Sequence, residues 1–188
     1  MPVKLSLTVD CKVVVCHMLL ILLIHSYVYI FGMSEKLIHL GYEVAAYLVI
    51  GWCTHHSVKE TMQWLEIEEM DILSDEVYTW GFVLKDSGYL FGSGGINFNE
   101  GEGVFELGYN IMHKYWNQGY TTEAAKAILE FAIQELNLKE FVSYHAVENP
   151  ASGKVMEKCG FVYEKNEVHT KFDGVTSWDT KKHRLIIQ

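Results

Sequence analysis

Alternating hydrophobic and polar positions in the middle of the chain predict an antiparallel sheet. A period of two, in segments rich in β-branched and aromatic residues, is typical of strands. A turn at 86–88 separates the first two segments. Gly92, Gly94 and Gly95 weaken the second segment and predict a bulge or a close backbone approach there. The three predicted strands are 77–84, 89–98 and 104–112.

The hydrophobic period changes to that of a helix after residue 119. From 122 to 137, apolar side chains recur at intervals of three and four residues, which predicts a sixteen-residue helix with one face on the sheet. A β-rich segment, 141–147, follows the helix. The strand 104–112, the helix and this segment therefore form a strand–helix–strand crossover, which should be right-handed.

A second helix and a final hairpin are predicted after residue 148. Asn149 is placed to cap this helix, Pro150 suits its first position, and Gly160 ends it. The turn at 173–174 is an Asp-Gly pair, which favours a hairpin. The strands predicted on either side of it are 161–168 and 178–187.

The first part of the chain allows two interpretations. Residues 13–34 contain no Asp, Glu, Lys or Arg, and such a segment is long enough to cross a bilayer, which takes about 20 residues. However, 13–15 has the pattern of a buried strand, and the chain from Met18 onward that of an apolar helix. We expect a strand and a helix of the folded domain, with a membrane anchor as the alternative. A capping box, Ser57 to Glu60, then predicts a helix over 57–72.

Composition indicates one globular domain over residues 1–188, with an atypical hydrophobic part at 1–40. Of the 188 residues, 49% are hydrophobic and 21% charged, and the net charge is −9. This acidic balance argues against nucleic-acid binding and favours a cationic partner. The cysteines, at positions 11, 16, 53 and 159, form no Cys-x-x-Cys pair, so we predict reduced thiols of a cytoplasmic protein, with no metal site.

A glycine turn before the central helix is the main candidate for a binding site. The segment 116–124 reads Trp-Asn-Gln-Gly-Tyr-Thr-Thr-Glu-Ala and runs directly from a strand into the helix. Unpaired amides and the helix dipole at such a turn suit a phosphate group. Gly119 has no Cβ, which lets the phosphate approach the main chain. The turn lacks the Gly-Lys-Ser/Thr of a P-loop and the further glycines of a dinucleotide fingerprint.

Three motifs carry a resemblance to a known family. They are Glu-Leu-Gly-Tyr at 106–109, Tyr-Trp-Asn-Gln-Gly-Tyr-Thr-Thr-Glu-Ala at 115–124, and Glu-Asn-Pro-Ala-Ser-Gly-Lys-Val-Met-Glu-Lys-Cys-Gly-Phe at 148–161. Together they resemble the Gcn5-related N-acetyltransferase (GNAT) family, and more narrowly its Rim-type branch, which acetylates N-terminal amines of ribosomal proteins. The likeness extends from about residue 57 to the end. Residues 8–16 are similar to the family's first strand.

The resemblance implies a mixed α/β fold and acetyl-CoA as the cofactor. In this family a mostly antiparallel sheet, flanked by helices, splays between the strands that match 104–112 and 141–147. The pantetheine arm binds in that gap as a missing strand would. The glycine turn holds the pyrophosphate, and an amide of the first strand polarises the thioester. The residues expected to contact the cofactor are Ile111, Met112, Gln118, Gly119, Tyr120, Thr121, Asn149 and Ser152.

Glu106 is the candidate general base. It lies on the central strand beside the expected thioester, and a carboxylate can take the proton of an amine through one water. The alternative is a strand glutamate that only positions its neighbours. His113 and His145 are weaker candidates, better explained as structural histidines. The family's frequent tyrosine acid falls on Met156, which cannot protonate the departing thiolate.

These observations predict an N-acetyltransferase that moves the acetyl group directly to a primary amine. The acceptor is a protein N-terminus or a small-molecule amine. A non-catalytic acyl-CoA-binding module and a membrane-tethered acetyltransferase are the alternatives. The sequence does not determine the oligomeric state, for which a homodimer is one option.

Overall fold

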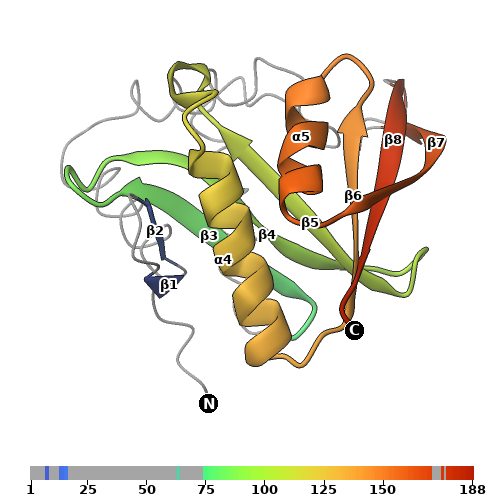
Figure 1. Cartoon of the computed structure of the whole chain (residues 1–188), viewed down its shortest axis with the longest axis horizontal. Helices are drawn as coiled ribbons and strands as arrows, with labels where there is room; N and C mark the ends of the chain where they lie inside the picture. The colour runs from blue at the N-terminus through green and yellow to red at the C-terminus, as the bar shows by residue number, and fades with distance from the viewer. Residues whose placement is uncertain (1–6, 9–12, 17–62, 64–73, 171–174, 176) are drawn as a thin grey trace.

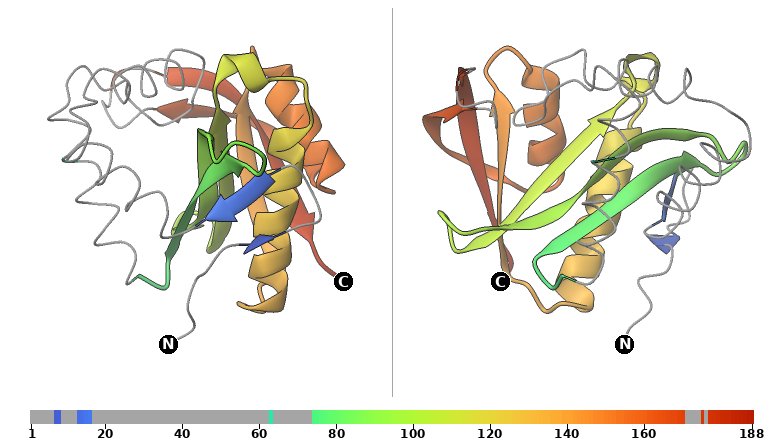
Figure 2. Two further views of the ribbon diagram at one scale, coloured as in Figure 1. Left: turned by 90° about the vertical axis from the view of Figure 1, so that its left-hand side faces the viewer. Right: turned by 180° about the vertical axis from the view of Figure 1, so that it is seen from behind.

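The described residues form one sheet of eight strands, and the helices α4 and α5 lie on one face of it, as Figure 1 and the side view in Figure 2 show. The computed structural model describes residues 7–8, 13–16, 63, 74–170, 175 and 177–188. The strand order is β1-β2-β3-β4-β5-β6-β8-β7. The strands are β1 (Leu7–Thr8), β2 (Val13–Cys16), β3 (Val77–Leu84), β4 (Leu90–Asn99), β5 (Val104–Ile111), β6 (Glu140–Ala146), β7 (Val162–Thr170) and β8 (Ser177–Ile186).

One junction in the sheet is parallel and very short. β5 pairs with β6 only at Phe105–Phe141 and Glu106–Val142, whereas every other pair of neighbouring strands is antiparallel. Beyond Glu106 the two strands diverge, as Figure 1 shows, and α5 lies over the space between them. The predicted fold class, a mostly antiparallel mixed sheet that splays at this junction, is confirmed.

The three central strands match their predicted positions to within a residue. The predicted irregularity in the second strand is also present, because the register of β3 against β4 shifts between Phe82 and Val83. A Cβ on Gly94 would lie only 2.6 Å from the carbonyl oxygen of Gly108 on β5, and one on Gly95 would collide with the Tyr78 carbonyl. Glycine is required at both positions because neighbouring backbone comes so close.

Helix α4 (Tyr120–Gln134) packs on the sheet through small side chains. It begins two residues earlier than predicted, because Gly119 takes a left-handed conformation (φ +87°) and the helix follows at once. It ends three residues earlier, since Asn137 is also left-handed (φ +53°) and turns the chain toward β6. Its buried residues are Ala124, Ala125, Ala127, Ile128, Leu129 and Ala132.

Helix α5 (Pro150–Lys158) has the predicted caps. The Asn149 side chain accepts a hydrogen bond from the Ser152 amide at 3.3 Å, and Pro150 occupies the first turn. Gly160 follows the helix with φ +92°. The predicted hairpin is present as β7 and β8, although the turn at 173–174 lies outside the described residues.

The predicted N-terminal strand is confirmed in part. β2 extends the sheet beside β3, but the expected single strand over 8–16 is instead two short strands, with β1 antiparallel to β2. The predicted helix from Met18 lies outside the described residues, and of the helix predicted over 57–72 only Gln63 is described, as helical. No helix in the described part combines the length and apolar character needed to cross a membrane.

Candidate active site

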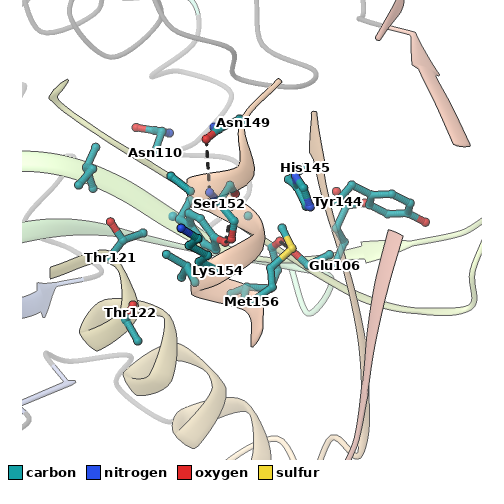
Figure 3. A pocket seen from close by; sticks show the side chains of 18 of the residues that line it. Glu106, Asn110, Thr121, Thr122, Tyr144, His145, Asn149, Ser152, Lys154 and Met156 are labelled. Atoms are coloured by element: carbon teal, nitrogen blue, oxygen red, sulfur yellow. Dashed lines mark hydrogen bonds between the residues drawn. The ribbon is translucent and has the colours of Figure 1, made fainter. Parts of the chain in front are cut away.

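A cavity of about 710 Å³ occupies the gap between β5 and β6. It is lined from both faces of the splayed sheet and by the starts of α4 and α5. Figure 3 shows Thr121 and Thr122 at the start of α4 on one side of α5, and Glu106 and Tyr144 on the other. The cavity therefore connects an N-terminal helix end with the carboxylate of the central strand.

Beyond Glu106, the edge of β5 that borders the gap is not paired with β6, so its main-chain groups are available to a ligand. The Ser143 hydroxyl donates to the Leu107 carbonyl at 2.8 Å, so the main-chain groups of Leu107 face β6. Alternation along a strand then directs the main-chain groups of Tyr109 and Ile111 to the same side. The Ile111 carbonyl already accepts from the Trp116 indole at 3.1 Å. The Ile111 amide is therefore the expected contact that the geometry supports best.

Met112 is placed differently from Ile111. Its amide donates to the Phe91 carbonyl at 2.9 Å, and its carbonyl accepts from the Tyr115 amide at 3.0 Å. Its side chain is buried and it does not line the cavity. Both main-chain groups are thus used inside the protein, and this departs from the main-chain contact expected of Met112.

The start of α4 presents amides to the cavity. Gly119 and Thr121 line it, and no side chain caps this helix end among the described residues. The first amides of a helix have no partner within the helix, so an anion could accept from them. The other two expected residues, Gln118 and Tyr120, are not among the residues that line the cavity. The Gln118 side chain donates to the Lys114 carbonyl at 2.9 Å, and the Tyr120 ring packs on Phe91.

Helix α5 contributes Asn149 and Ser152, as expected, and ties them to β5. The Tyr109 hydroxyl donates to the Ser152 carbonyl at 2.9 Å and receives a bond from the Ser152 hydroxyl at 3.2 Å. Burial raises the pKa of Tyr109 well above its ordinary value. Lys154, exposed on the same helix, also lines the cavity and adds a positive charge near the α4 amides (Figure 3).

Glu106 lies in the cavity wall with one clear hydrogen-bond partner. Asn99 Nδ2 donates to Glu106 Oε2 at 2.8 Å. Burial raises the pKa of Glu106, and the Asn99 hydrogen bond partly opposes that rise. A carboxylate with a raised pKa is a better proton acceptor near neutral pH.

A network of charged side chains around the buried Lys182 lies next to Glu106. The Lys182 side chain is only 2% exposed, and its Nζ lies 2.5 Å from Glu102. Arg184 bonds to Glu102 at 2.8 Å and also pairs with Glu140 and Glu164. The hydrogen bond from Lys182 is the main reason that the pKa of Glu102 is lowered. The network fixes the turn between β4 and β5, which carries Asn99 and leads to Glu106.

Of the two histidine candidates, His145 lines the cavity and His113 does not. His145 is 5% exposed, its Nδ1 lies 2.8 Å from the Ala146 carbonyl, and a Cβ on Gly153 would lie 2.6 Å from its ring. His113 packs its ring on Trp116 at 4.7 Å.

Sequence reasoning missed several residues that line the cavity. Tyr109 was inside the Glu-Leu-Gly-Tyr motif and could have been found there, since a strand tyrosine beside a predicted gap has a hydroxyl to satisfy. The others come from segments far apart in the chain, so spacing gives no signal for them. They are Asn99, Asn110, Trp116, Tyr144, Lys154 and His169.

Comparison with known proteins supports the same architecture. The family model of the acetyltransferase (GNAT) domain matches residues 37–162. The uncharacterized N-acetyltransferase YnaD of Bacillus subtilis is 35% identical over 86 residues, which are 46% of this chain and 51% of YnaD. The chain thus spans about half the length of that curated relative.

Two solved structures share the fold. A candidate ribosomal-protein-serine acetyltransferase from Vibrio cholerae superposes with a TM-score of 0.72 at 20% identity, over 99% of both chains. Mutant forms of the spermidine/spermine N-acetyltransferase SpeG from Vibrio cholerae give 0.61 at 19% identity, over 82% of this chain and 88% of theirs.

Proposed function

The chain belongs to the acetyltransferase (GNAT) domain family, and from this premise we propose that it transfers an acetyl group from acetyl-CoA to a primary amine. The observation that carries the proposal is the cavity between β5 and β6, which joins the uncapped start of α4 to Glu106. One end suits the phosphates of the donor and the other suits an amine.

The residues around the gap fit coenzyme A. The amides at the start of α4 and the Lys154 ammonium suit the pyrophosphate. An added Cβ on Gly119 would meet no atom of the described part of the chain within 4 Å, which leaves room for the phosphate. The Ile111 amide and the edge of β5 can pair with the pantetheine amides. When bound, acetyl-CoA supplies a thioester whose carbonyl carbon is open to attack.

Glu106 is proposed as the general base of a direct transfer. The amine nitrogen forms a bond to the thioester carbon, the carbon–sulfur bond breaks, and coenzyme A leaves as a thiolate. The proton lost by the amine passes to Glu106, through one water where needed. The raised pKa of Glu106 supports this role.

The departing thiolate has no evident acid on α5. Met156, where the family often has a tyrosine, is buried in the cavity wall and has no proton to give. The Tyr109 hydroxyl is held by Ser152 and is assigned to bracing α5 against β5. We propose that solvent protonates the thiolate, which is a good leaving group.

The acceptor class is a primary amine, either a protein N-terminus or a small molecule. The names of the two structural neighbours, one for a ribosomal protein and one for spermidine, support both options. The cytoplasm is the proposed location, in keeping with the free thiol of Cys159.

A thiol-release assay with acetyl-CoA and a panel of amines tests the proposal. We expect amine-dependent release of coenzyme A by the parent protein and a loss of about a hundredfold or more in Glu106→Gln, the usual effect of a positioned base. Calorimetric binding of coenzyme A without any turnover would instead favour the alternative, a non-catalytic acyl-CoA-binding module.

A further inference from the structure

Neither the backbone conformation nor the packing around it requires a glycine at position 108. Its φ is not in the left-handed region, unlike that of Gly88 or Gly119. A Cβ built on it would meet no atom of the described residues within 4 Å, whereas one on Gly92 or Gly94 would collide with the neighbouring strand. Gly108 is also exposed, although it lies in the middle of a central strand.

The open space over Gly108 belongs to the cavity and lies on the face that carries Glu106. Alternation puts Glu106, Gly108 and Asn110 on one face of β5, while Leu107 and Tyr109 point to the opposite face, toward the core and α5. Gly108 lies about 7 Å along the strand from Glu106, because a strand advances ~3.4 Å per residue. All three residues line the cavity.

The charges of the lining select among amines. Among the described lining residues, Glu106 is the one carboxylate, whereas Lys154 and Lys158 add positive charge. A polyamine would bring further ammonium groups and needs further carboxylates near the site. An acceptor with a single ammonium group, such as a peptide amino terminus, needs only Glu106.

Resting on the proposed function, we propose that Gly108 determines acceptor specificity. The amine of a singly charged acceptor is held at Glu106, and the substituent on its α-carbon occupies the space above Gly108. Asn110, two residues further along the same face, also lines the cavity and exchanges hydrogen bonds with Ser93 at 3.2 and 3.3 Å. A side chain at position 108 would enter this space, since its Cβ has no atom of the described residues within 4 Å.

The test compares Gly108→Ala and Gly108→Val with the parent protein. The acceptors are the tripeptides Gly-Ala-Ala and Val-Ala-Ala, with spermidine as the competing class. We expect the parent to prefer the peptides to spermidine. In Gly108→Ala, kcat/KM for Val-Ala-Ala should fall about tenfold or more, the effect of one methyl group in a fitted pocket, and that for Gly-Ala-Ala less. Gly108→Val should lower both.

Two controls distinguish an effect on acceptor binding from an effect on stability or on cofactor binding. The Tm of both variants should be unchanged or higher, because a side chain replaces glycine in a strand, and calorimetric affinity for coenzyme A should be unchanged. Unchanged kcat/KM for both peptides, a parallel loss of coenzyme A affinity, or a parent that prefers spermidine would each overturn the inference. A parent protein that does not bind coenzyme A would overturn the proposed function as well.

Discussion

The Asn99 side chain donates from Nδ2 to Glu106 Oε2 at 2.8 Å, and its own Oδ1 accepts the Glu102 amide at 3.1 Å. One carboxamide thus connects the candidate base to the turn that carries Glu102 and its ion pairs with Lys182 and Arg184. Asn99 has a positioning role, since it holds one oxygen of Glu106 and leaves the other for a proton. The bond also favours the ionised form of Glu106.

Removing this bond should move the pH dependence of the reaction. In Asn99→Ala the pKa of Glu106 should rise further, because the bond that opposes the effect of burial is lost. The base works only when ionised, so the acidic limb of kcat/KM should shift upward by about one pH unit, the equivalent of a charged hydrogen bond of ~1.5 kcal/mol. At high pH the variant should approach the parent.

Asn166→Ala is the matched control for this experiment. Asn166 also uses its side chain in a hydrogen bond, from the Tyr163 hydroxyl at 3.1 Å, but it lies on exposed β7 away from the cavity. Its pH profile should follow that of the parent. A profile of Asn99→Ala parallel to the parent, with a uniform loss of rate, would remove the positioning role.

Glu106→Gln should lower activity and raise stability at neutral pH. The pKa of Glu106 is raised in the folded protein, so its ionised form opposes folding once the pH exceeds the unfolded pKa. The variant should therefore have a higher Tm than the parent at pH 8 and the same Tm in acid, with coenzyme A affinity retained. Thermal melts at both pH values, with exposed Glu100→Gln as control, check this. A lower Tm at pH 8 would mean that the carboxylate braces the strand.

Gly119→Val should abolish binding of coenzyme A beyond any cost in stability. Valine at this position is also strained by ~1–2 kcal/mol, because φ at Gly119 is +87°. Gly88→Val is the matched control, since Gly88 also has positive φ (+67°) and open space, but lies in a turn outside the cavity. Both variants should lose similar stability, and only Gly119→Val should lose affinity in calorimetry. Equal affinities would argue against the phosphate site.

Glu102→Gln should be strongly destabilising. It leaves Lys182, which is 2% exposed, without its nearest carboxylate, and breaking a buried ion pair on one side costs ~3 kcal/mol. The pKa of Glu102 is lowered in the folded state, so its contribution is present above the unfolded pKa and is lost as the pH falls through the folded value. Chemical denaturation should show a large difference at pH 7 that disappears in acid. A constant difference across pH would assign the effect to packing.

The sequence predicted the elements of the fold where local signals are strong. The alternation over 77–84 matched β3 residue for residue, and Asn149 and Pro150 located the start of α5. The family resemblance is confirmed by the domain match. The end of α4 was misplaced because Asn137 fits the helical pattern, and its left-handed conformation depends on the path to β6.

The site was harder to predict than the fold. The glycine turn and Glu106 could be proposed as candidates from the sequence, because each lies in a continuous motif. Asn99 and Tyr144 line the cavity because strand pairing brings together residues that are far apart in the chain. A local sequence pattern does not indicate which distant residues will meet in this way. The hydrogen bond from the Met112 amide to the Phe91 carbonyl likewise joins residues far apart in the chain.

The short junction of β5 and β6 also divides the sheet into two parts that are weakly joined. β1 to β5 form one run of paired strands and β6 to β8 another, with only Phe105–Phe141 and Glu106–Val142 joining the two by strand pairing. Either run of strands can unfold locally while the strand pairing of the other stays intact. Local unfolding should therefore be faster along the gap than elsewhere in the sheet. Amide hydrogen exchange at Tyr109 and Ile111 should therefore be fast in the free protein. A ligand that fills the gap should slow it and make the two runs unfold in a single transition.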